Sequence, residues 1–214
     1  MATRRRLALV SATSFALFDT LVEADLPPDP AGAVGEELRA RDVPVPDDWA
    51  DAYDETHVDA PAGAEVPLPA HVSRALASRG VDAPGNAARR AVVAAFDPSV
   101  RTRAGAVEAV AAAGERGPVG VFANCAVPEL VGRVLVRSDL ARDDFDAVVS
   151  SVACGWRAPD PRAFERVADA LGVDAARLTH VGSDPEVGGG VTACGGRFFD
   201  ARPGAISDRL SAIE

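Results

Sequence analysis

The chain has 214 residues, which suits one domain, or a core with a smaller inserted unit, and allows a sizeable buried core. Hydrophobic residues make up 48% of it, a fraction that indicates a folded protein and excludes a disordered one. The formal net charge of -10 disfavours contact with phosphate backbones, so we expect no nucleic-acid partner. No apolar stretch reaches the ~20 residues of a membrane span, so we expect no membrane partner.

The basic residues are all arginine, since none of the 22 Lys+Arg positions is a lysine. Arginine stays protonated, so no side chain of this chain can act as an amine base or form a Schiff base. The absence of lysine together with an excess of aspartate resembles the halophile-like acidic composition of proteins from salt-loving archaea. A GC-rich genome produces the same replacement of lysine by arginine.

The cysteines and the first residues bear on location. Cys125, Cys154 and Cys194 form no CxxC pair, which argues against a disulfide framework and for a reducing cytosol. We expect them to be small buried side chains. Three arginines at residues 4–6 precede an apolar run, a superficial likeness to a secretory signal. Because that run continues into the first predicted strand, we expect no cleaved signal and a cytoplasmic location.

The first predicted element is a buried strand at residues 7–18, apolar up to Asp19 and Thr20. A proline-rich stretch at residues 27–30 then breaks the chain. From there to about residue 100 the pattern is helical with Pro and Gly punctuation, and helices are indicated at residues 72–79 and 88–96. This block interrupts the pattern on either side of it and indicates an inserted helical cap.

After residue 100 the pattern alternates between helix and strand. Helices are predicted near residues 106–111, 128–135 and 161–171, and strands near residues 119–122, 145–149, 178–181 and 195–199. For the last helix, Asp160 is the expected N-cap, Pro161 the first residue and Gly172 the end. Strands that alternate with single helices form parallel βαβ units. We therefore predict an α/β fold, a Rossmann-like doubly wound parallel sheet core of residues 1–22 and 101–214 with a helical cap at 23–100.

Of four short segments, three follow predicted strands, at the sheet edge where open α/β sheets bind ligands, and the remaining one precedes the helix capped by Asp160. The four are, in chain order, residues 14–22 (SFALFDTLV), 120–125 (GVFANC), 155–161 (GWRAPDP) and 180–188 (HVGSDPEVG). Their order and flanking residues resemble the haloacid dehalogenase (HAD) superfamily, most of whose members are phosphatases. The likeness covers nearly the whole chain, including the helical insertion after the first segment. Its most specific part is the frame from Gly155 to Pro161.

The resemblance implies that the reactive positions of the family are vacated here. It places a nucleophilic aspartate where this chain has Ala16, a phosphate-binding Ser or Thr at Ala123, and a lysine at Ala158. It also places two acidic ligands of Mg²⁺ at Ser183 and Gly188, so the family's metal lacks its ligands and we expect no cofactor. A methyl group at position 16 cannot form the covalent aspartyl intermediate. We expect no catalytic residue at these five positions, and we expect them to meet in one cleft.

Several polar side chains remain beside the vacated positions: Asp19, Thr20, Asn124, Arg157 and Asp184. Asp19 lies three residues beyond the attack position, so we do not expect its carboxylate to replace the nucleophile. Asn124 keeps an amide, whereas Arg157 is expected to be a surface or ion-paired side chain. Asp184 together with Glu186 offers at most a weak metal site. His180, inside a predicted strand, is expected to be a core histidine with its hydrogen bonds satisfied.

Three functional interpretations follow. The first is a catalytically inactive protein of this fold, a pseudoenzyme or an active-site-stripped variant, that binds a small phosphorylated ligand or a protein partner. The second is an active hydrolase, either a phosphomonoester hydrolase that uses rewired Asp19 or Asp184, or a 2-haloacid dehalogenase-like enzyme, which still needs a carboxylate at position 16. The third is an interaction module that keeps only the fold. We favour the first, because loss of a nucleophile alone costs on the order of 10⁶ in rate.

Overall fold

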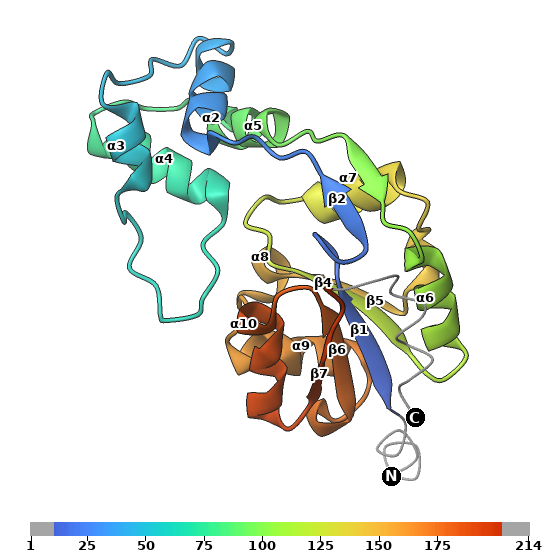
Figure 1. Cartoon of the computed structure of the whole chain (residues 1–214). Helices are drawn as coiled ribbons and strands as arrows, with labels where there is room; N and C mark the ends of the chain where they lie inside the picture. The colour runs from blue at the N-terminus through green and yellow to red at the C-terminus, as the bar shows by residue number, and fades with distance from the viewer. Residues whose placement is uncertain (1–10, 203–214) are drawn as a thin grey trace.

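The computed structural model describes residues 11–202 of the chain. At its centre lies a five-stranded parallel sheet in the order β5-β4-β1-β6-β7 (Figure 1). The strands are β1 (Ala12–Ala16), β4 (Val119–Ala123), β5 (Ala147–Ser150), β6 (Leu178–Gly182) and β7 (Arg197–Asp200). The chain adds β4 and β5 on one side of β1, and then β6 and β7 on the other. This order confirms the predicted α/β class with a doubly wound parallel sheet.

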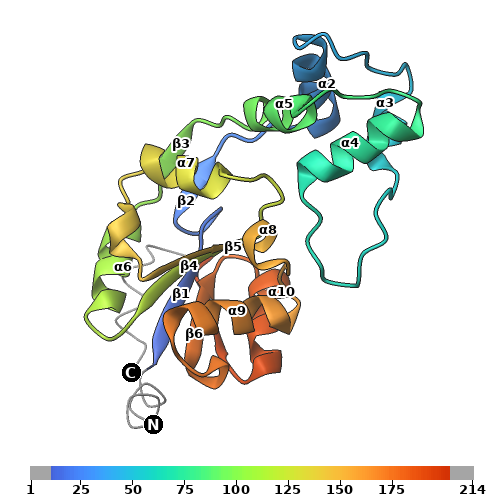
Figure 2. The same ribbon diagram turned by 180° about the vertical axis from the view of Figure 1, so that it is seen from behind.

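Helices cover both faces of the sheet (Figures 1 and 2). One face packs against α6 (Ala106–Gly114) and α7 (Leu130–Arg137), and the other against α9 (Pro161–Leu171). β4 and β6 are buried at every residue, as is usual for parallel strands that are covered on two sides. Because both of their faces are buried, these strands lack the alternation of apolar and polar residues that marks a strand with one solvent-exposed face.

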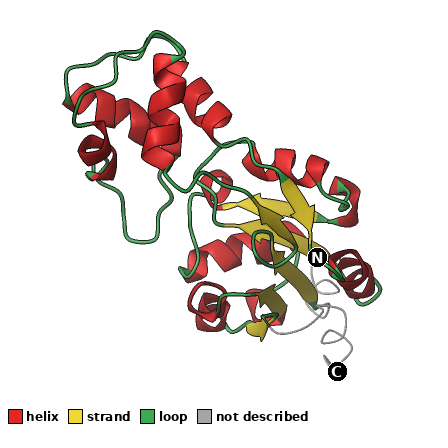
Figure 3. Cartoon of the chain, turned by 45° about the horizontal axis from the view of Figure 1, so that its top comes forward, coloured by secondary structure: helices red, strands yellow, loops and turns green. Residues whose placement is uncertain are grey.

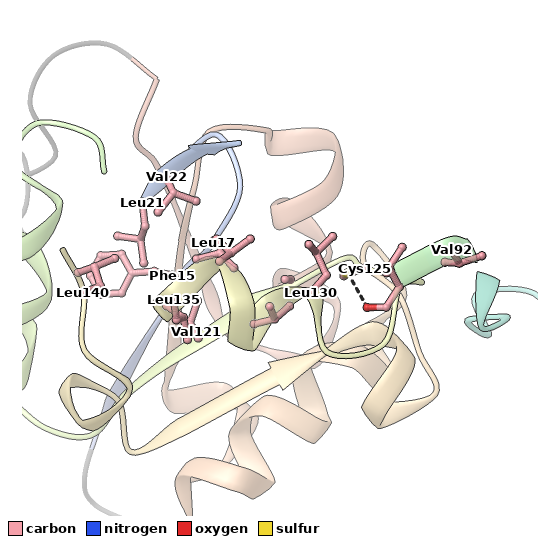
Figure 4. Close-up of a cluster of buried hydrophobic side chains, with 14 of the residues drawn as sticks. Phe15, Leu17, Leu21, Val22, Val92, Val121, Cys125, Leu130, Leu135 and Leu140 are labelled. Atoms are coloured by element: carbon pink, nitrogen blue, oxygen red, sulfur yellow. Dashed lines mark hydrogen bonds between the residues drawn. The ribbon is translucent and has the colours of Figure 1, made fainter. Parts of the chain in front are cut away.

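The apolar core forms two layers, one on each face of the sheet. The first layer contains Phe15, Val121 and Leu135 (Figure 4). The second contains Phe122 and Phe164. Successive residues of a strand point to opposite faces, which is why Val121 and Phe122 belong to different layers.

Four helices lie between two short strands outside the main sheet. The strands are β2 (Val22–Ala24) and β3 (Val100–Thr102), and the helices are α2 (Pro30–Arg39), α3 (Trp49–Asp54), α4 (Leu68–Ser78) and α5 (Ala87–Ala95). Figure 3 shows these helices as a group beside the sheet. β2 and β3 pair antiparallel, so the two ends of the helical segment meet in a ribbon. Sequence periodicity predicted helices near α4 and α5 but missed α3 and the ribbon, because elements this short show no period.

The first predicted strand ends earlier than expected. β1 stops at Ala16 and not at Phe18, because the chain turns at Asp19, which adopts a φ of 57°. A positive φ is incompatible with an extended strand. The earlier part of the predicted strand, at residues 7–10, and the arginines at residues 4–6 lie outside the described residues.

Later boundaries also shift at residues with positive φ. The helix predicted from Pro128 begins at Leu130, because Glu129 has a φ of 68°. The last strand begins at Arg197 and not at Gly195, which turns the chain with a φ of 85°. Such turns cannot be read from apolar periodicity alone.

The start and the end of α9 agree with the sequence. The Asp160 carboxylate accepts a hydrogen bond from the backbone N–H of Arg162 at 3.0 Å, and Pro161 is the first helical residue. Gly172 ends the helix in the left-handed conformation. The Arg162 guanidinium also lies 3.4 Å from the centre of the Trp156 ring, so this helix start is packed as well as capped.

We predict that Gly190 is required for the fold, because its backbone lies against the loop before α9. A β-carbon at Gly190 would lie 2.7 Å from the carbonyl carbon of Pro159 and 2.8 Å from its Cα. We expect Gly190→Ala to lower the free energy of unfolding in urea by about 3 kcal/mol. The neighbouring substitution Gly189→Ala is the control, since a β-carbon there meets no atom within 4 Å. Equal losses in the two variants would show that the close approach at Gly190 is not what the fold depends on.

Candidate functional site

A cavity of about 200 Å³ opens at the carboxyl ends of β1, β4 and β6. All five positions at which the resemblance implies a missing reactive residue line it: Ala16, Ala123, Ala158, Ser183 and Gly188. Strand register explains the convergence, because Ala16 pairs with Phe122 and Phe15 pairs with Val181, so the three parallel strands end at the same edge. The side chains at these positions are the methyl groups of three alanines, the hydroxyl of Ser183 and the hydrogen atom of Gly188.

Three of the polar residues expected beside these positions also line the cavity: Asp19, Asn124 and Asp184. Thr20 and Arg157 do not. The Thr20 hydroxyl is buried, accepts a hydrogen bond from the Ser183 backbone N–H at 3.0 Å and donates to the Ser183 hydroxyl at 3.2 Å. The Arg157 side chain is 55% exposed, and its guanidinium lies 4.0 Å from the Glu65 carboxylate. Thr20 therefore positions Ser183, and Arg157 forms a surface ion pair.

The Asn124 amide fixes the loop that carries Ala158. Its Nδ2 donates to the Ala158 carbonyl at 2.8 Å, and its Oδ1 accepts from the Ala158 N–H at 2.9 Å. These two bonds join the end of β4 to the segment before α9. Both ends of the amide are thus engaged with the backbone, and its role in this structure is to hold the wall of the cavity.

The residues of the cavity do not fit Mg²⁺, the ion that the resemblance implies. Mg²⁺ demands several oxygen ligands in near-octahedral geometry. The Asp184 carboxylate caps α10 (Pro185–Gly188) by accepting from the Glu186 N–H at 2.9 Å. Among residues 11–202, no group of three or more His, Cys, Asp or Glu side chains is placed to hold a metal ion. The two carboxylates at the cavity, Asp19 and Asp184, are too few for such a site.

The space beside Gly188 is filled by aromatic rings. A β-carbon at Gly188 would lie 2.9 Å from Cδ2 of Phe198 and 3.1 Å from Cδ2 of His180. Phe198 comes from β7 and packs against the apolar layer on this face of the sheet. An aspartate fits at position 188 only if the Phe198 ring moves. The second metal-ligand position implied by the resemblance is therefore repacked with apolar atoms.

His180 on β6 is the buried polar residue at the floor of the cavity. It is 2% exposed, and its Nδ1 is 2.9 Å from the hydroxyl oxygen of Ser14. Burial lowers the pKa of His180 to about 3, so the imidazole is neutral at pH 7. The sequence predicted a core histidine with a hydrogen-bond partner, as observed. It did not predict that His180 also lines the cavity. The available signal was its position two residues before Gly182, on the same face of the strand.

The cysteine beside the second motif, Cys125, is a packing residue. It is buried, and its thiol donates to the Val127 carbonyl at 3.3 Å (Figure 4). Burial raises the pKa of the Cys125 thiol, which disfavours the nucleophilic thiolate. Cys125, Cys154 and Cys194 are all free thiols.

We predict that stability falls on mild acidification because of His180. The pKa of His180 is about 3 in the folded state and ~6.5 in the unfolded state, so the unfolded chain binds more protons between these values. The contribution of His180 is fully present above pH 6.5 and is lost as the pH falls toward 3. We expect the free energy of unfolding in urea to drop by about 2 kcal/mol between pH 7 and pH 5.

The control is the double variant Ser14→Ala/His180→Leu, which removes the titrating group together with its partner. The part of the pH dependence that this variant keeps belongs to other groups. If the slope between pH 7 and pH 5 is the same in both proteins, His180 is not a buried neutral histidine.

A parallel α/β core, a helical segment inserted after the first strand and a cavity at the carboxyl ends of the central strands together describe a HAD-like hydrolase fold. The comparisons with solved structures agree. The chain matches a 2-haloacid dehalogenase from Pseudomonas syringae pv. Tomato DC3000 with a TM-score of 0.65 and 18% sequence identity, over 95% of this chain and 99% of that one. No protein-family model and no curated protein sequence matches the chain.

Two further matches belong to the same group. One is a predicted phosphoglycolate phosphatase from Haemophilus somnus 129PT, with a TM-score of 0.58 and 13% identity over 96% of this chain and 98% of that one. The other is the HAD family enzyme BT-2542 from Bacteroides thetaiotaomicron, in complex with magnesium and inorganic phosphate. Its TM-score is 0.58, with 12% identity over 96% of this chain and 100% of that one. At these identities the likeness shows the fold, which is that of the HAD-like hydrolases.

Proposed function

We propose that this chain is a HAD-fold binding protein, a pseudoenzyme that keeps the cavity of the fold and lacks family-type hydrolysis. One observation carries the proposal: the five positions that would supply nucleophile, hydroxyl, ammonium and metal ligands line one cavity and hold Ala16, Ala123, Ala158, Ser183 and Gly188. Function belongs to the site and not to the fold, so the hydrolase-like fold does not by itself restore the activity.

The chemistry of hydrolysis supports the same proposal. Covalent catalysis needs a carboxylate at the attack position, and Ala16 offers a methyl group. The chain has no lysine to offset charge on a phosphoryl group, and among residues 11–202 no arginine lines the cavity. Loss of the nucleophile alone lowers the rate by on the order of 10⁶, and further losses add little once it is gone.

The alternative is a hydrolase that uses Asp19 or Asp184 in new roles, and it is favoured by the presence of both carboxylates at the cavity. Two features weigh against it. Asp19 lies beyond the end of β1 in a left-handed turn, and the Asp184 carboxylate is engaged in capping α10. A dehalogenase needs no metal, but it still needs the carboxylate that position 16 lacks.

The proposal extends to organisation and location. Residues 23–100 act as a cap on a core of residues 1–22 and 101–214, joined by the ribbon of β2 and β3. The three free thiols support a reducing cytosol, and the acidic, lysine-free composition supports a salt-rich one. Within residues 11–202, no helix has the length and apolar character to cross a membrane.

We expect negligible phosphatase and dehalogenase turnover by the unmodified chain. The measurement is release of phosphate from p-nitrophenyl phosphate and a panel of metabolite phosphomonoesters with Mg²⁺, and release of halide from L-2-chloropropionate. The control variants are Asp19→Asn and Asp184→Asn. Robust turnover that either substitution abolishes would replace the pseudoenzyme with the rewired hydrolase.

We also expect that introducing the family's residues at the five positions is not enough by itself to create a tight Mg²⁺ site. Ala16→Asp alone should not bind Mg²⁺, and the set Ala16→Asp, Ala123→Ser, Ala158→Lys, Ser183→Asp and Gly188→Asp should bind it weakly, because the Phe198 ring fills the space beside position 188.

Adding Phe198→Ala to this set should raise Mg²⁺ affinity by about tenfold or more in calorimetric titration, since an oxygen ligand then has room to reach the ion. Phe199→Ala is the matched control, because the adjacent residue points to the other face of the sheet. Equal Mg²⁺ affinity with and without Phe198→Ala would show that the ring does not obstruct the site.

A further inference from the structure

The imidazole of His180, a buried residue, borders the cavity through one of its nitrogens. Nδ1 of His180 is bonded to Ser14, whereas Nε2 has no hydrogen-bond partner among residues 11–202. A β-carbon built at Gly182 would lie 3.6 Å from this Nε2 and 3.6 Å from Cβ of Ala16. Because Ala16, Gly182 and His180 all line the cavity, Nε2 borders the space into which the side chain at position 16 points.

The hydrogen bond to Ser14 determines which nitrogen carries the proton. The Ser14 hydroxyl is fully buried, and Nδ1 of His180 is its one partner in the described chain. If Nδ1 carried the proton and donated it, the Ser14 O–H would be left buried without an acceptor, which costs about 1–3 kcal/mol. Ser14 therefore donates to Nδ1. The neutral imidazole then carries its proton on Nε2 and presents a donor to the cavity.

The rest of the cavity disfavours anions. In the part of the chain that the structure describes, the charged residues that line it are Asp19 and Asp184, and none of the lining residues is an arginine. Its remaining walls are largely apolar, with Phe18, Phe122 and Val187 among them. A neutral ligand group meets no charge repulsion there, whereas a carboxylate or phosphate meets two negative charges and no positive one.

The size of the cavity suits a small molecule. An apolar cavity of roughly 150 Å³ accommodates benzene, so about 200 Å³ has room for a six-membered ring with one small substituent.

We propose that the cavity binds a small uncharged molecule with an apolar body and a carbonyl-type acceptor, oriented by a hydrogen bond from Nε2–H of His180. The assignment rests on the function proposed above, because a working hydrolase site would fill the same space with carboxylates and a metal ion. It replaces the phosphorylated ligand expected from the sequence with an uncharged one, since the cavity offers no cation.

The test uses two probes of nearly the same shape, cyclohexanone and methylenecyclohexane, which differ in the acceptor oxygen. Binding to the ¹⁵N-labelled full chain is followed by NMR titration at pH 7. We expect cyclohexanone to bind about fivefold more tightly, the gain of one net hydrogen bond. Cyclohexanecarboxylate should bind more weakly than either, because of Asp19 and Asp184. In the free protein, the imidazole ¹⁵N shifts of His180 should show a protonated Nε2.

The double variant Ser14→Ala/His180→Leu should lose the preference for cyclohexanone, and His57→Leu, which alters a histidine of the helical segment, should keep it. The inference fails if the two neutral probes bind equally, if neither binds at 10 mM, if the carboxylate binds most tightly, or if Nε2 of His180 is unprotonated. Because the ¹⁵N shifts are read on the unmodified chain, they decide the point even if the double variant does not fold. Mg²⁺-dependent hydrolysis would instead overturn the proposed function, and the turnover assay that detects it is independent of these binding measurements.

Discussion

The hydrogen bond between Ser14 and His180 joins the two central strands, β1 and β6, on a face of the sheet that is otherwise apolar. Neither side chain reaches bulk water, so each depends on the other for its hydrogen bond. The ring of His180 in turn packs against Phe164, with ring centres 5.0 Å apart. Because the residues that bound the cavity lie two positions further along the same strands, this one bond sets the floor on which the site is built.

Two further contacts hold the walls, and neither involves a reactive group. Thr20 fixes Ser183 at the end of β6, and Asn124 fixes Ala158 before α9. These contacts link the first motif segment to the fourth and the second to the third, and the pairing of β1 with β4 joins the two pairs. A frame of this kind does not depend on whether the side chains that face the cavity are reactive.

The sequence was sufficient to predict the parallel sheet, the two ends of α9 and the residues that meet at the cavity, because each follows from local periodicity or from the shared edge of parallel strands. It was insufficient for the ribbon of β2 and β3, whose pairing joins residues far apart in the chain, such as Val22 and Thr102. It also missed the roles of Phe198 and His180 beside Gly188. Those roles depend on where β6 and β7 lie side by side, and no pattern within either strand encodes that neighbour relation.

The rings of Phe198 and His180 lie close to Gly188, so this position differs from one that merely has a small side chain beside empty space. Where such space is empty, a single substitution can introduce a larger side chain without displacing its neighbours. At position 188 aromatic atoms that contribute to the core occupy the space beside the backbone, so placing a carboxylate there costs packing as well as desolvation. The lining of the cavity therefore combines apolar side chains with the carboxylates of Asp19 and Asp184, the Ser183 hydroxyl and the imidazole of His180.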